Sequence, residues 1–480
     1  MENLSQENSY RNILKRISAF GGVQLFNILV SLVRGKFVAM FLGPEGMGIS
    51  SLYTSATGTI QQLSGLGLNA AFVKETASAR EDSGQLPGVL AASIRLIVFT
   101  ALLGGVASIF LSPLLSLWTF GTADYTIGFL LLSLSVSLSI AGAGYLSLLQ
   151  GIGEVKRLAK ATLVGGITGL CCGVPLYYFF GYDGIVPGII ILSAATFLFY
   201  FISFRQSVRV AHVSFKWAEH KPLVRRLLAT GIVLMMGSVG GTFVSYLINA
   251  FVRMAGSVED VGLFQAANSL TNQYVGLMFS VLALDYFPRL AAAKSDREKF
   301  NEIINRQIEI DSLIITPLLL LLMLTAPLIV RLFLTVDFLN VIPLIRWLGL
   351  GSMIQAVAFP LGYVLISQDN RRVYVWIEVV LSNLLWLLCS VFFYYQLGLI
   401  GLGVSLVVRS VIGDSVTFAV ICKYYGFRLN RSNIWLILAM ALTVSGGFIS
   451  CYYPSVSDIV LVLLTVISLA FAFRRIKSKI

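Results

Sequence analysis

Long apolar runs alternate with short polar or Gly/Pro-containing connections along the whole chain. Because an α-helix needs roughly 20 apolar residues to cross the ~30 Å hydrocarbon core of a bilayer, each run of that length predicts one membrane span. Cutting the chain at the interruptions predicts about fourteen spans, at residues 17–41, 47–68, 89–111, 126–149, 161–181, 184–204, 228–252, 261–287, 308–330, 341–366, 373–396, 399–421, 433–452 and 457–473. The pattern therefore predicts an all-α, polytopic membrane protein.

Positive charge is concentrated in alternate connections and at the two ends of the chain. Lys and Arg gather near the N-terminus, at 156–160, 205–226, 289–306, 371–372 and 423–431, and after residue 473. Short cytoplasmic connections retain Lys and Arg, whereas the opposite connections are poor in them. We therefore expect both termini on the cytoplasmic side of an inner membrane. The first span has no small-residue cleavage site after it, so we expect it to remain in the protein.

The composition excludes a soluble globular protein. Hydrophobic residues make up 57% of the 480 and charged residues only 12%, whereas a soluble domain has about 25% charged residues. The net charge of +12 does not indicate nucleic-acid binding, because the cations sit between apolar runs and form no single basic face. His212 and His220 fall in a basic connection, and the five cysteines show no paired spacing. The sequence therefore predicts no metal site and no cofactor.

A short internal repeat indicates two similar halves. Glu45-Gly46-Met47-Gly48-Ile49 resembles Glu259-Asp260-Val261-Gly262-Leu263, at a separation of 214 residues. Six spans per half is an even number, so both halves would run the same way through the membrane, as in transporters with parallel repeats. We expect an N-terminal six-helix lobe at 1–204, a basic cytoplasmic connection at 205–227, a C-terminal six-helix lobe at 228–421, and two extra helices with a basic tail at 422–480.

Polar side chains form a stripe on the first predicted span. This stripe, spaced by three, four and three residues and thus confined to one face of a helix, consists of Gln24, Asn27, Ser31 and Arg34. The eighth span carries a similar stripe, made of Gln265, Asn268 and Asn272. Polar groups in hydrocarbon are costly, so such stripes face either a cavity or a neighbouring helix. An arginine is the costliest to leave without a function, which makes Arg34 the principal candidate for a substrate contact.

The remaining intramembrane charges differ between the two halves. The first half offers Arg34 and Arg95 without a central carboxylate. The second half offers both signs, with Arg409 and the carboxylates Glu378 and Asp414. Guanidinium groups suit phosphate oxygens, so the first half predicts an anionic, phosphate-bearing substrate. Glu378 and Asp414 are the candidates for coupling transport to H⁺ or Na⁺.

The N-terminal sequence resembles that of a known transporter family. The segment from Asn27 to Gly48, NILVSLVRGKFVAMFLGPEGMG, is followed by Leu52-Tyr53 and Leu66-Gly67-Leu68. It is similar to the start of the polysaccharide-type flippases of the multidrug/oligosaccharidyl-lipid/polysaccharide exporter superfamily. The layout of two six-helix lobes, a basic connection and two extra helices resembles that family over the whole chain.

The resemblance implies a V-shaped pair of helical bundles in a bacterial inner membrane. It also implies alternating-access transport of an undecaprenyl-pyrophosphate-linked oligosaccharide, an O-antigen or capsule repeat unit, from the cytoplasmic to the periplasmic leaflet. In related lipid II flippases an Arg-Asp-x-x-Val-Ala pattern places its arginine in the central cavity, and Arg34-Gly-Lys-Phe-Val-Ala resembles it. Gly35 stands where that pattern has an acidic residue, so any ion pair made by that residue has no counterpart here.

Two other functions are compatible with a polytopic membrane protein. A drug or metabolite exporter on the same fold would call for carboxylates in the cavity of the first lobe, and the sequence places none there. A polysaccharide polymerase or ligase would need a sizeable exposed loop or a constellation of carboxylate and histidine. We therefore expect a transporter and not an enzyme, acting as a monomer on a lipid-linked oligosaccharide within membrane lipid. Its cytoplasmic connections are open to partners in polymer assembly, such as a polysaccharide polymerase.

Overall fold

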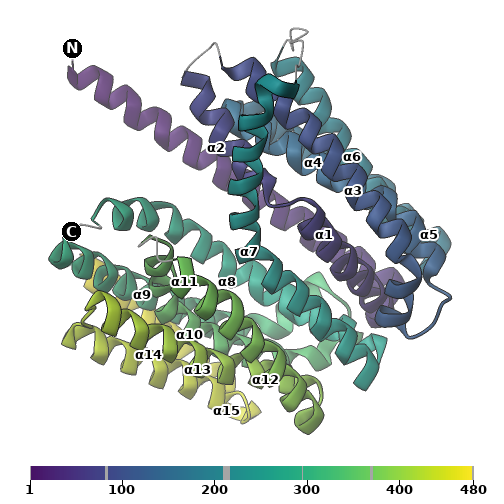
Figure 1. Cartoon of the computed structure of the whole chain (residues 1–480). Helices are drawn as coiled ribbons and strands as arrows, with labels where there is room; N and C mark the ends of the chain where they lie inside the picture. The colour runs from purple at the N-terminus through teal and green to yellow at the C-terminus, as the bar shows by residue number, and fades with distance from the viewer. Residues whose placement is uncertain (1, 82–84, 209–216, 294–295, 368–370, 478–480) are drawn as a thin grey trace. The chain divides into compact units, whose positions relative to one another are not determined.

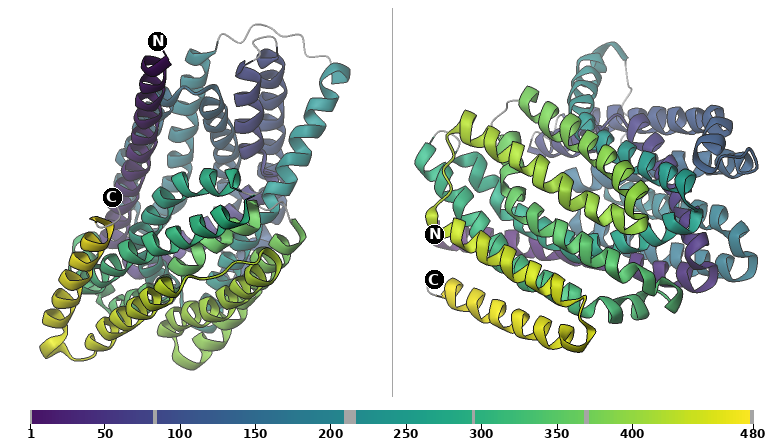
Figure 2. Two further views of the ribbon diagram at one scale, coloured as in Figure 1. Left: turned by 90° about the vertical axis from the view of Figure 1, so that its left-hand side faces the viewer. Right: turned by 90° about the horizontal axis from the view of Figure 1, so that it is seen from below.

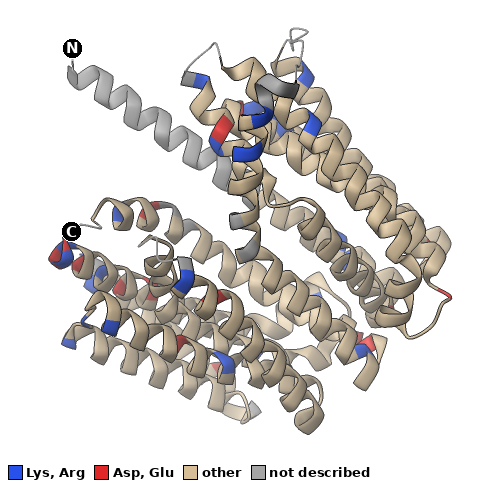
Figure 3. Cartoon of the chain, in the orientation of Figure 1, with Lys and Arg blue, Asp and Glu red and all other residues tan. Residues whose placement is uncertain are grey.

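The structure is a computed structural model that describes residues 2–81, 85–208, 217–293, 296–367 and 371–477 (Figure 1). Every regular element in these ranges is a helix, which confirms the predicted all-α class. Within the described residues, ten helical stretches are long and apolar enough to cross a membrane, or twelve if each of two bent helix pairs is one span. Most of each long helix is free of Lys, Arg, Asp and Glu (Figure 3). The chain is therefore a multi-pass membrane protein.

The predicted count of fourteen spans is not confirmed, because two of the ten long stretches each contain two predicted spans. The stretch Leu25–Ser64 is 40 residues long and kinks at Gly43, whose backbone is non-helical at φ 65° and ψ −166°. The stretch Val155–Ser207 is 53 residues long and contains a 3₁₀ turn at Gly181–Gly184. At 1.5 Å per residue, either stretch is roughly twice as long as a single crossing requires. Two crossings in each of them remain a prediction.

The helices group into two compact units, of which the first comprises Met1–Met254. Its elements are α1 (Glu2–Ser64), α2 (Leu68–Glu81), α3 (Leu86–Phe120), α4 (Thr126–Ile152), α5 (Val155–Phe180), the 3₁₀ turn η1 (Gly181–Gly184), α6 (Ile185–Ser207) and nearly all of α7 (Trp217–Ala255). A core cluster joins Phe72 of α2, Leu148 of α4 and Phe204 of α6. Gly144 lets α4 approach α3 closely, since a Cβ there would lie 2.5 Å from Ile97.

Polar contacts near both ends of α7 join it to the other helices of unit 1. Near its start, Arg226 pairs with Glu75 of α2. Near its end, Arg253 Nε donates to Thr119 O at 2.9 Å, and the Tyr246 hydroxyl lies 3.0 Å from Thr119 Oγ1. Arg253 thus supplies donors to the free carbonyls at the C-terminus of α3. The predicted lobe boundary at 205–227 stays a prediction, and residues 209–216 of that connection lie outside the described ranges.

The second unit comprises Ala255–Ile480. Its elements are α8 (Val258–Ala292), α9 (Arg297–Phe333), the 3₁₀ helix η2 (Val336–Val341), α10 (Ile342–Ser367), α11 (Arg371–Tyr374), the π-helix η3 (Val375–Leu381), α12 (Ser382–Leu397), α13 (Leu399–Tyr425), α14 (Arg431–Ser450) and α15 (Pro454–Lys477). Its core packs Ile304 and Ile308 of α9 against Leu361 of α10 and Ile421 of α13. The Tyr286 hydroxyl of α8 is buried there and donates to Pro360 O at 2.9 Å.

Both units contain the same tight helical hairpin, which supports an internal repeat. The motif Val-x-x-Tyr-Tyr-x-x-Gly-x-x-Gly occurs at 174–184, between α5 and α6, and at 391–401, between α12 and α13. Gly181 and Gly398 adopt nearly the same conformation, with φ 55° and ψ −128° in one and φ 60° and ψ −140° in the other. The last glycine allows close approach, because a Cβ on Gly184 or Gly401 would lie 2.3 or 2.0 Å from a carbonyl oxygen of the preceding helix.

In each unit an acidic residue of the repeated segment, at 45–49 or 259–263, accepts a hydrogen bond from the hairpin. In unit 1 the Tyr182 hydroxyl donates to Glu45 Oε2 at 3.1 Å. In unit 2 the Tyr394 hydroxyl donates to Asp260 Oδ2 at 2.8 Å. Tyr182 follows the first hairpin glycine of its unit, whereas Tyr394 precedes that of unit 2. A tyrosine–carboxylate contact therefore occurs in both units, although the tyrosine comes from a different position of the hairpin motif.

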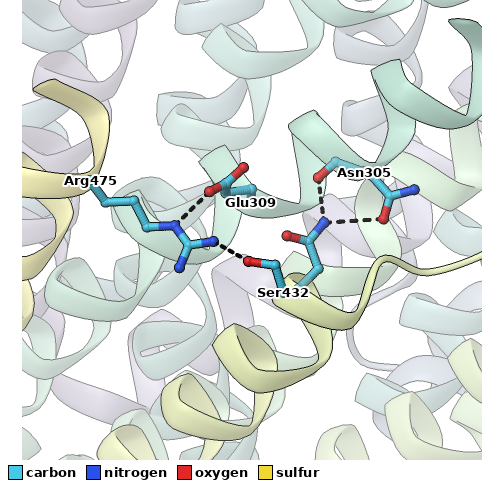
Figure 4. A network of polar contacts seen from close by, with 5 residues as sticks. Asn305, Glu309, Ser432 and Arg475 are labelled. Atoms are coloured by element: carbon cyan, nitrogen blue, oxygen red, sulfur yellow. Dashed lines mark hydrogen bonds and ion pairs between the residues drawn. The ribbon is translucent and has the colours of Figure 1, made fainter. Parts of the chain in front are cut away.

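Polar contacts attach the two C-terminal helices to α9, beside which both lie (Figures 1 and 2). Arg475 of α15 bridges Glu309 Oε1 of α9 at 2.6 Å and Ser432 Oγ of α14 at 2.7 Å (Figure 4). Asn433 Nδ2 donates to Asn305 O at 2.7 Å. Glu309 is buried, with 9% of its side chain exposed, and Arg475 compensates its charge.

Replacing Arg475 by Ala should destabilise unit 2. The buried Glu309 carboxylate would lose the charge of Arg475, and since Arg475 is itself partly exposed we expect a loss of about 2 kcal/mol, less than that of a fully buried pair. Thermal unfolding of the detergent-solubilised protein measures the effect. Arg474→Ala is the matched control, because Arg474 is the exposed neighbour on the same helix. Equal melting temperatures for the two variants would contradict the assignment.

Candidate functional site

A cavity of about 320 Å³ lies inside unit 1, between α1, α4, α5 and α6. Helix α1 contributes Asn27, Ser31 and Arg34 to its lining, which are three of the four residues of the predicted polar stripe. The spacing of these residues places them on one face of α1, and that face meets the other three helices. The side chain of Gln24, the fourth residue, lies outside the described part of the chain. The structure therefore brings the N-terminal stripe to a cavity.

Hydroxyl groups line much of the remainder of this cavity. They belong to Ser139, Thr162, Ser193, Thr196 and Tyr200. The apolar part of the lining consists of Val30, Gly166, Leu170 and Leu192. Two pairs of these hydroxyls bond across helices. Ser139 Oγ of α4 donates to Ser193 Oγ of α6 at 3.1 Å, and the Thr162 and Tyr200 hydroxyls of α5 and α6 are 3.2 Å apart. Each hydroxyl can both donate and accept, so the wall can exchange these bonds for bonds to a polyhydroxylated ligand.

Arg34 is the one charged residue among those lining the unit 1 cavity. Its side chain is partly buried. A guanidinium within an apolar bundle is costly unless it faces a polar cavity, and Arg34 does so. A guanidinium presents a rigid fork of donors that matches phosphate oxygens. The cavity therefore combines a binding group for an anion with a surface of hydroxyls and an amide.

Arg95 does not join Arg34 in this cavity. It lies on α3, which contributes no residue to the lining, and its side chain is exposed. The sequence predicted both arginines as substrate contacts. Of the two, Arg34 lines a cavity that the structure describes. Substrate contact by Arg95 stays a prediction.

The predicted stripe of the eighth span makes contacts along its own helix, α8. Asn272 Nδ2 donates to Asn268 Oδ1 at 2.9 Å, one turn earlier. Gln265 and Asn268 are partly buried, and Asn272 is exposed. These three amides line neither the cavity of unit 1 nor the charged cavity of unit 2 described next, and their assignment to substrate binding stays a prediction.

A second cavity, of about 310 Å³, lies inside unit 2 and is charged. Glu378 of the π-helix η3 and Arg409 and Asp414 of α13 line it together with Gln355 of α10. Their remaining neighbours are Phe279, Ala358, Phe359, Gly362, Tyr363, Ile366 and Tyr374. Both carboxylates that the sequence singled out for ion coupling therefore share one cavity, in which Arg409 is a third member.

The three charges interact, and they leave the cavity with one net negative charge when both acids are ionised. Arg409 interacts electrostatically with both Asp414 and Glu378. Its guanidinium carbon also lies 6.0 Å from the Trp386 ring centroid. Asp414 Oδ2 is buried and has no hydrogen-bond partner among the described residues. A buried carboxylate oxygen without a donor is a natural acceptor for a proton or a small cation.

The π-helix places Glu378 at this cavity. A π-helix interrupts the regular hydrogen-bond ladder, and such segments are frequent at functional sites. Here Asn383 Nδ2 donates to Val379 O at 2.8 Å and lies 3.5 Å from Glu378 O, so a side chain satisfies carbonyl groups of the irregular segment. The chain thus stabilises an unusual backbone at the position that carries the partly buried Glu378.

The linings of the two cavities overlap in part when the two halves of the internal repeat are aligned. Three pairs of lining residues, separated by 216, 216 and 217 positions, are Ser139 and Gln355, Thr162 and Glu378, and Leu192 and Arg409. Where unit 1 has hydroxyl or apolar groups, unit 2 has an amide and charges. Sequence reasoning missed this correspondence, although the repeated hairpin motif that precedes Leu192 and Arg409 would have revealed it.

Comparisons with known proteins agree with this fold. A family model described as polysaccharide biosynthesis protein matches residues 37–343. The Lipid III flippases of Escherichia coli (strain K12) and Shigella flexneri are each 22% identical over 362 residues, covering 74% of this chain and 85% of theirs. The solved structure of the lipid II flippase MurJ in an inward closed conformation superposes with a TM-score of 0.72 at 14% identity, covering 96% of this chain and 99% of that one. An inward-facing multidrug resistance MATE family transporter gives 0.64 at 18% identity, covering 88% and 98%.

Removing the positive charge of the unit 2 cavity should destabilise the protein. In Arg409→Gln the two carboxylates would face each other in a low dielectric without a counter-charge, at a cost of about 3 kcal/mol. Neutralising the acids as well, in the triple variant with Glu378→Gln and Asp414→Asn, should recover most of that loss. Thermal unfolding in detergent measures both. A triple variant no more stable than Arg409→Gln would mean that charge is not the cause.

Proposed function

The chain belongs to the polysaccharide biosynthesis protein family, and from this premise we propose that it is a flippase for an undecaprenyl-pyrophosphate-linked oligosaccharide. The substrate would be an O-antigen or capsule repeat unit, moved from the cytoplasmic to the periplasmic leaflet of a bacterial inner membrane. The observation that carries the proposal is the convergence of Arg34, Asn27 and Ser31 with a wall of hydroxyls in one cavity of unit 1. An anion and sugar hydroxyls are what such a lining can bind together.

In this mechanism Arg34 receives the pyrophosphate and the hydroxyls of α4, α5 and α6 bind the sugars. The lipid tail stays in the bilayer, because only the head group needs to leave hydrocarbon. Alternating access then exposes the cavity to one side of the membrane at a time. The chain needs no bond to be made or broken for this step, so the proposal describes a transporter and not an enzyme, with both termini in the cytoplasm and one chain as the functional unit.

A drug exporter on the same fold is less well supported by the lining of the unit 1 cavity. A cationic drug calls for a carboxylate, and the lining residues of this cavity include none. Likeness to a multidrug transporter at 18% identity concerns the fold alone.

Loss of Arg34 should abolish polymer export. Arg34→Ala would remove charge-assisted hydrogen bonds to the pyrophosphate, which together account for about 10- to 100-fold in binding. Complementation of a strain lacking its own flippase, with protein level followed by immunoblot, measures the effect, and lipid-linked repeat units should accumulate on the inner leaflet. Lys36→Gln is the control, since Lys36 is on the same helix but does not line the cavity. Full polymer synthesis by Arg34→Ala would overturn the proposal.

We further propose that Glu378 and Asp414 couple transport to a proton or sodium gradient. Their support is the shared cavity, its single net negative charge and Asp414 Oδ2, which has no hydrogen-bond partner in the part of the chain that the structure describes. Glu378→Gln and Asp414→Asn should each lower gradient-driven flux in proteoliposomes by about tenfold, because each removes an ionisable group from the membrane interior. Asp458→Asn, at an exposed acid of α15, is the control. If imposing ΔpH or a sodium gradient accelerates these two variants as it does the wild type, the assignment is wrong.

A further inference from the structure

A third cavity, of about 380 Å³, lies where α8 ends and α9 begins. It plays no part in the proposed transport mechanism. Arg289, Ala292 and Ala293 line it from the end of α8, and Lys299, Glu302, Ile303, Arg306 and Gln307 from the first turns of α9. Ala293 and Gln307 are each 3% exposed, so the cavity has a buried floor. The cationic residues are exposed and form its walls.

The charge of this cavity favours an anion. Three cations, Arg289, Lys299 and Arg306, stand against one carboxylate, Glu302. Arg289 is also paired with Asp285, whose side chain is 75% exposed, and that carboxylate competes with any anion in the cavity. Two guanidinium groups and an ammonium group from two helices are the donors that phosphate oxygens bind best.

The position of the cavity along α9 points to the head-group layer of the membrane. Helix α9 has 37 residues, which at 1.5 Å each is about 55 Å, well beyond the ~30 Å of hydrocarbon. Its charged residues gather between Arg297 and Asp311, whereas 312–330 carries none, so the charged end is the one that leaves the hydrocarbon. Lipid phosphates lie in this layer, and basic pockets between helices at this depth bind anionic head groups.

We propose that this cavity is a phosphate-binding site at the membrane interface, formed by Arg289, Lys299 and Arg306, whose ligand is the head group of an anionic phospholipid. A free pyrophosphate group shares the same chemistry. The site is separate from the proposed transport cavity and does not depend on it, so either proposal can fail while the other holds.

The test measures lipid binding to the purified full-length protein by native mass spectrometry. The wild type should retain phosphatidylglycerol in preference to phosphatidylcholine. The double variant Lys299→Gln/Arg306→Gln should bind phosphatidylglycerol about tenfold or more weakly, since both substitutions remove charged hydrogen-bond donors from the cavity and a hydrogen bond to a charged group contributes roughly tenfold. Arg431→Gln, which removes an exposed cation at the same end of unit 2, should bind as the wild type does.

Two further arms sharpen the result. Asp285→Asn frees Arg289 from its competitor and should bind phosphatidylglycerol severalfold more tightly, a gain that misfolding cannot produce. Pyrophosphate titrated into the complex distinguishes the sources, because displacement of the lipid assigns the site to phosphate groups in general and retention assigns it to the phospholipid. Equal phosphatidylglycerol binding by the wild type, the double variant and Asp285→Asn would overturn the proposal.

Discussion

The cost of leaving a polar or charged group in hydrocarbon governs the arrangement of this protein. Each such group must find a partner within the bundle, and the structure shows two kinds of solution. One is a direct hydrogen bond between two polar side chains, as where Asn272 bonds to Asn268 one turn away. The other is to open a cavity, in which several polar groups satisfy one another and remain available to a ligand. Arg34 with its hydroxyl wall and the Glu378–Arg409–Asp414 cluster belong to the second kind.

The internal repeat explains why there are two such cavities. Both units build the same hairpin, with glycines where the backbone turns sharply and where the next helix comes close to the previous one. The hairpin fixes the helices on both of its sides, so residues at matching positions, such as Thr162 and Glu378, line cavities in both units. The geometry is therefore common to both units while the chemistry is not. A fold duplicated in this way can keep its packing and still change what each half binds.

Much of this arrangement follows from the sequence, because the membrane imposes simple rules. The apolar runs predict the helices, and the three-four-three spacing predicts that Asn27, Ser31 and Arg34 face one space. The hydroxyls that complete the cavity could not be predicted, since Ser and Thr in a membrane helix often bond only to their own backbone, as Thr196 does to Leu192 O at 2.9 Å. The meeting of Glu378 with Asp414 depends on how η3 packs on α13, which no local pattern contains. The number of crossings does not follow from apolar length alone, because a Gly/Pro interruption such as that at Gly43 is compatible both with a kink within one long helix and with a turn between two crossings.

The opposite charges of the two cavities bear directly on how coupling would work. If an anionic head group and a coupling cation entered one cavity, they would neutralise each other there and tend to move together. Here the guanidinium stands in unit 1 and the net negative cluster in unit 2, so each ligand has its own binding groups. Under the proposed function, coupling requires the cation to favour one conformation of the protein over another. That requirement makes Arg409 significant beyond its stabilising charge, because a proton or cation on either acid changes the balance of attraction around it. Under this proposal, the gradient would change the conformation of the protein through the contacts of Arg409.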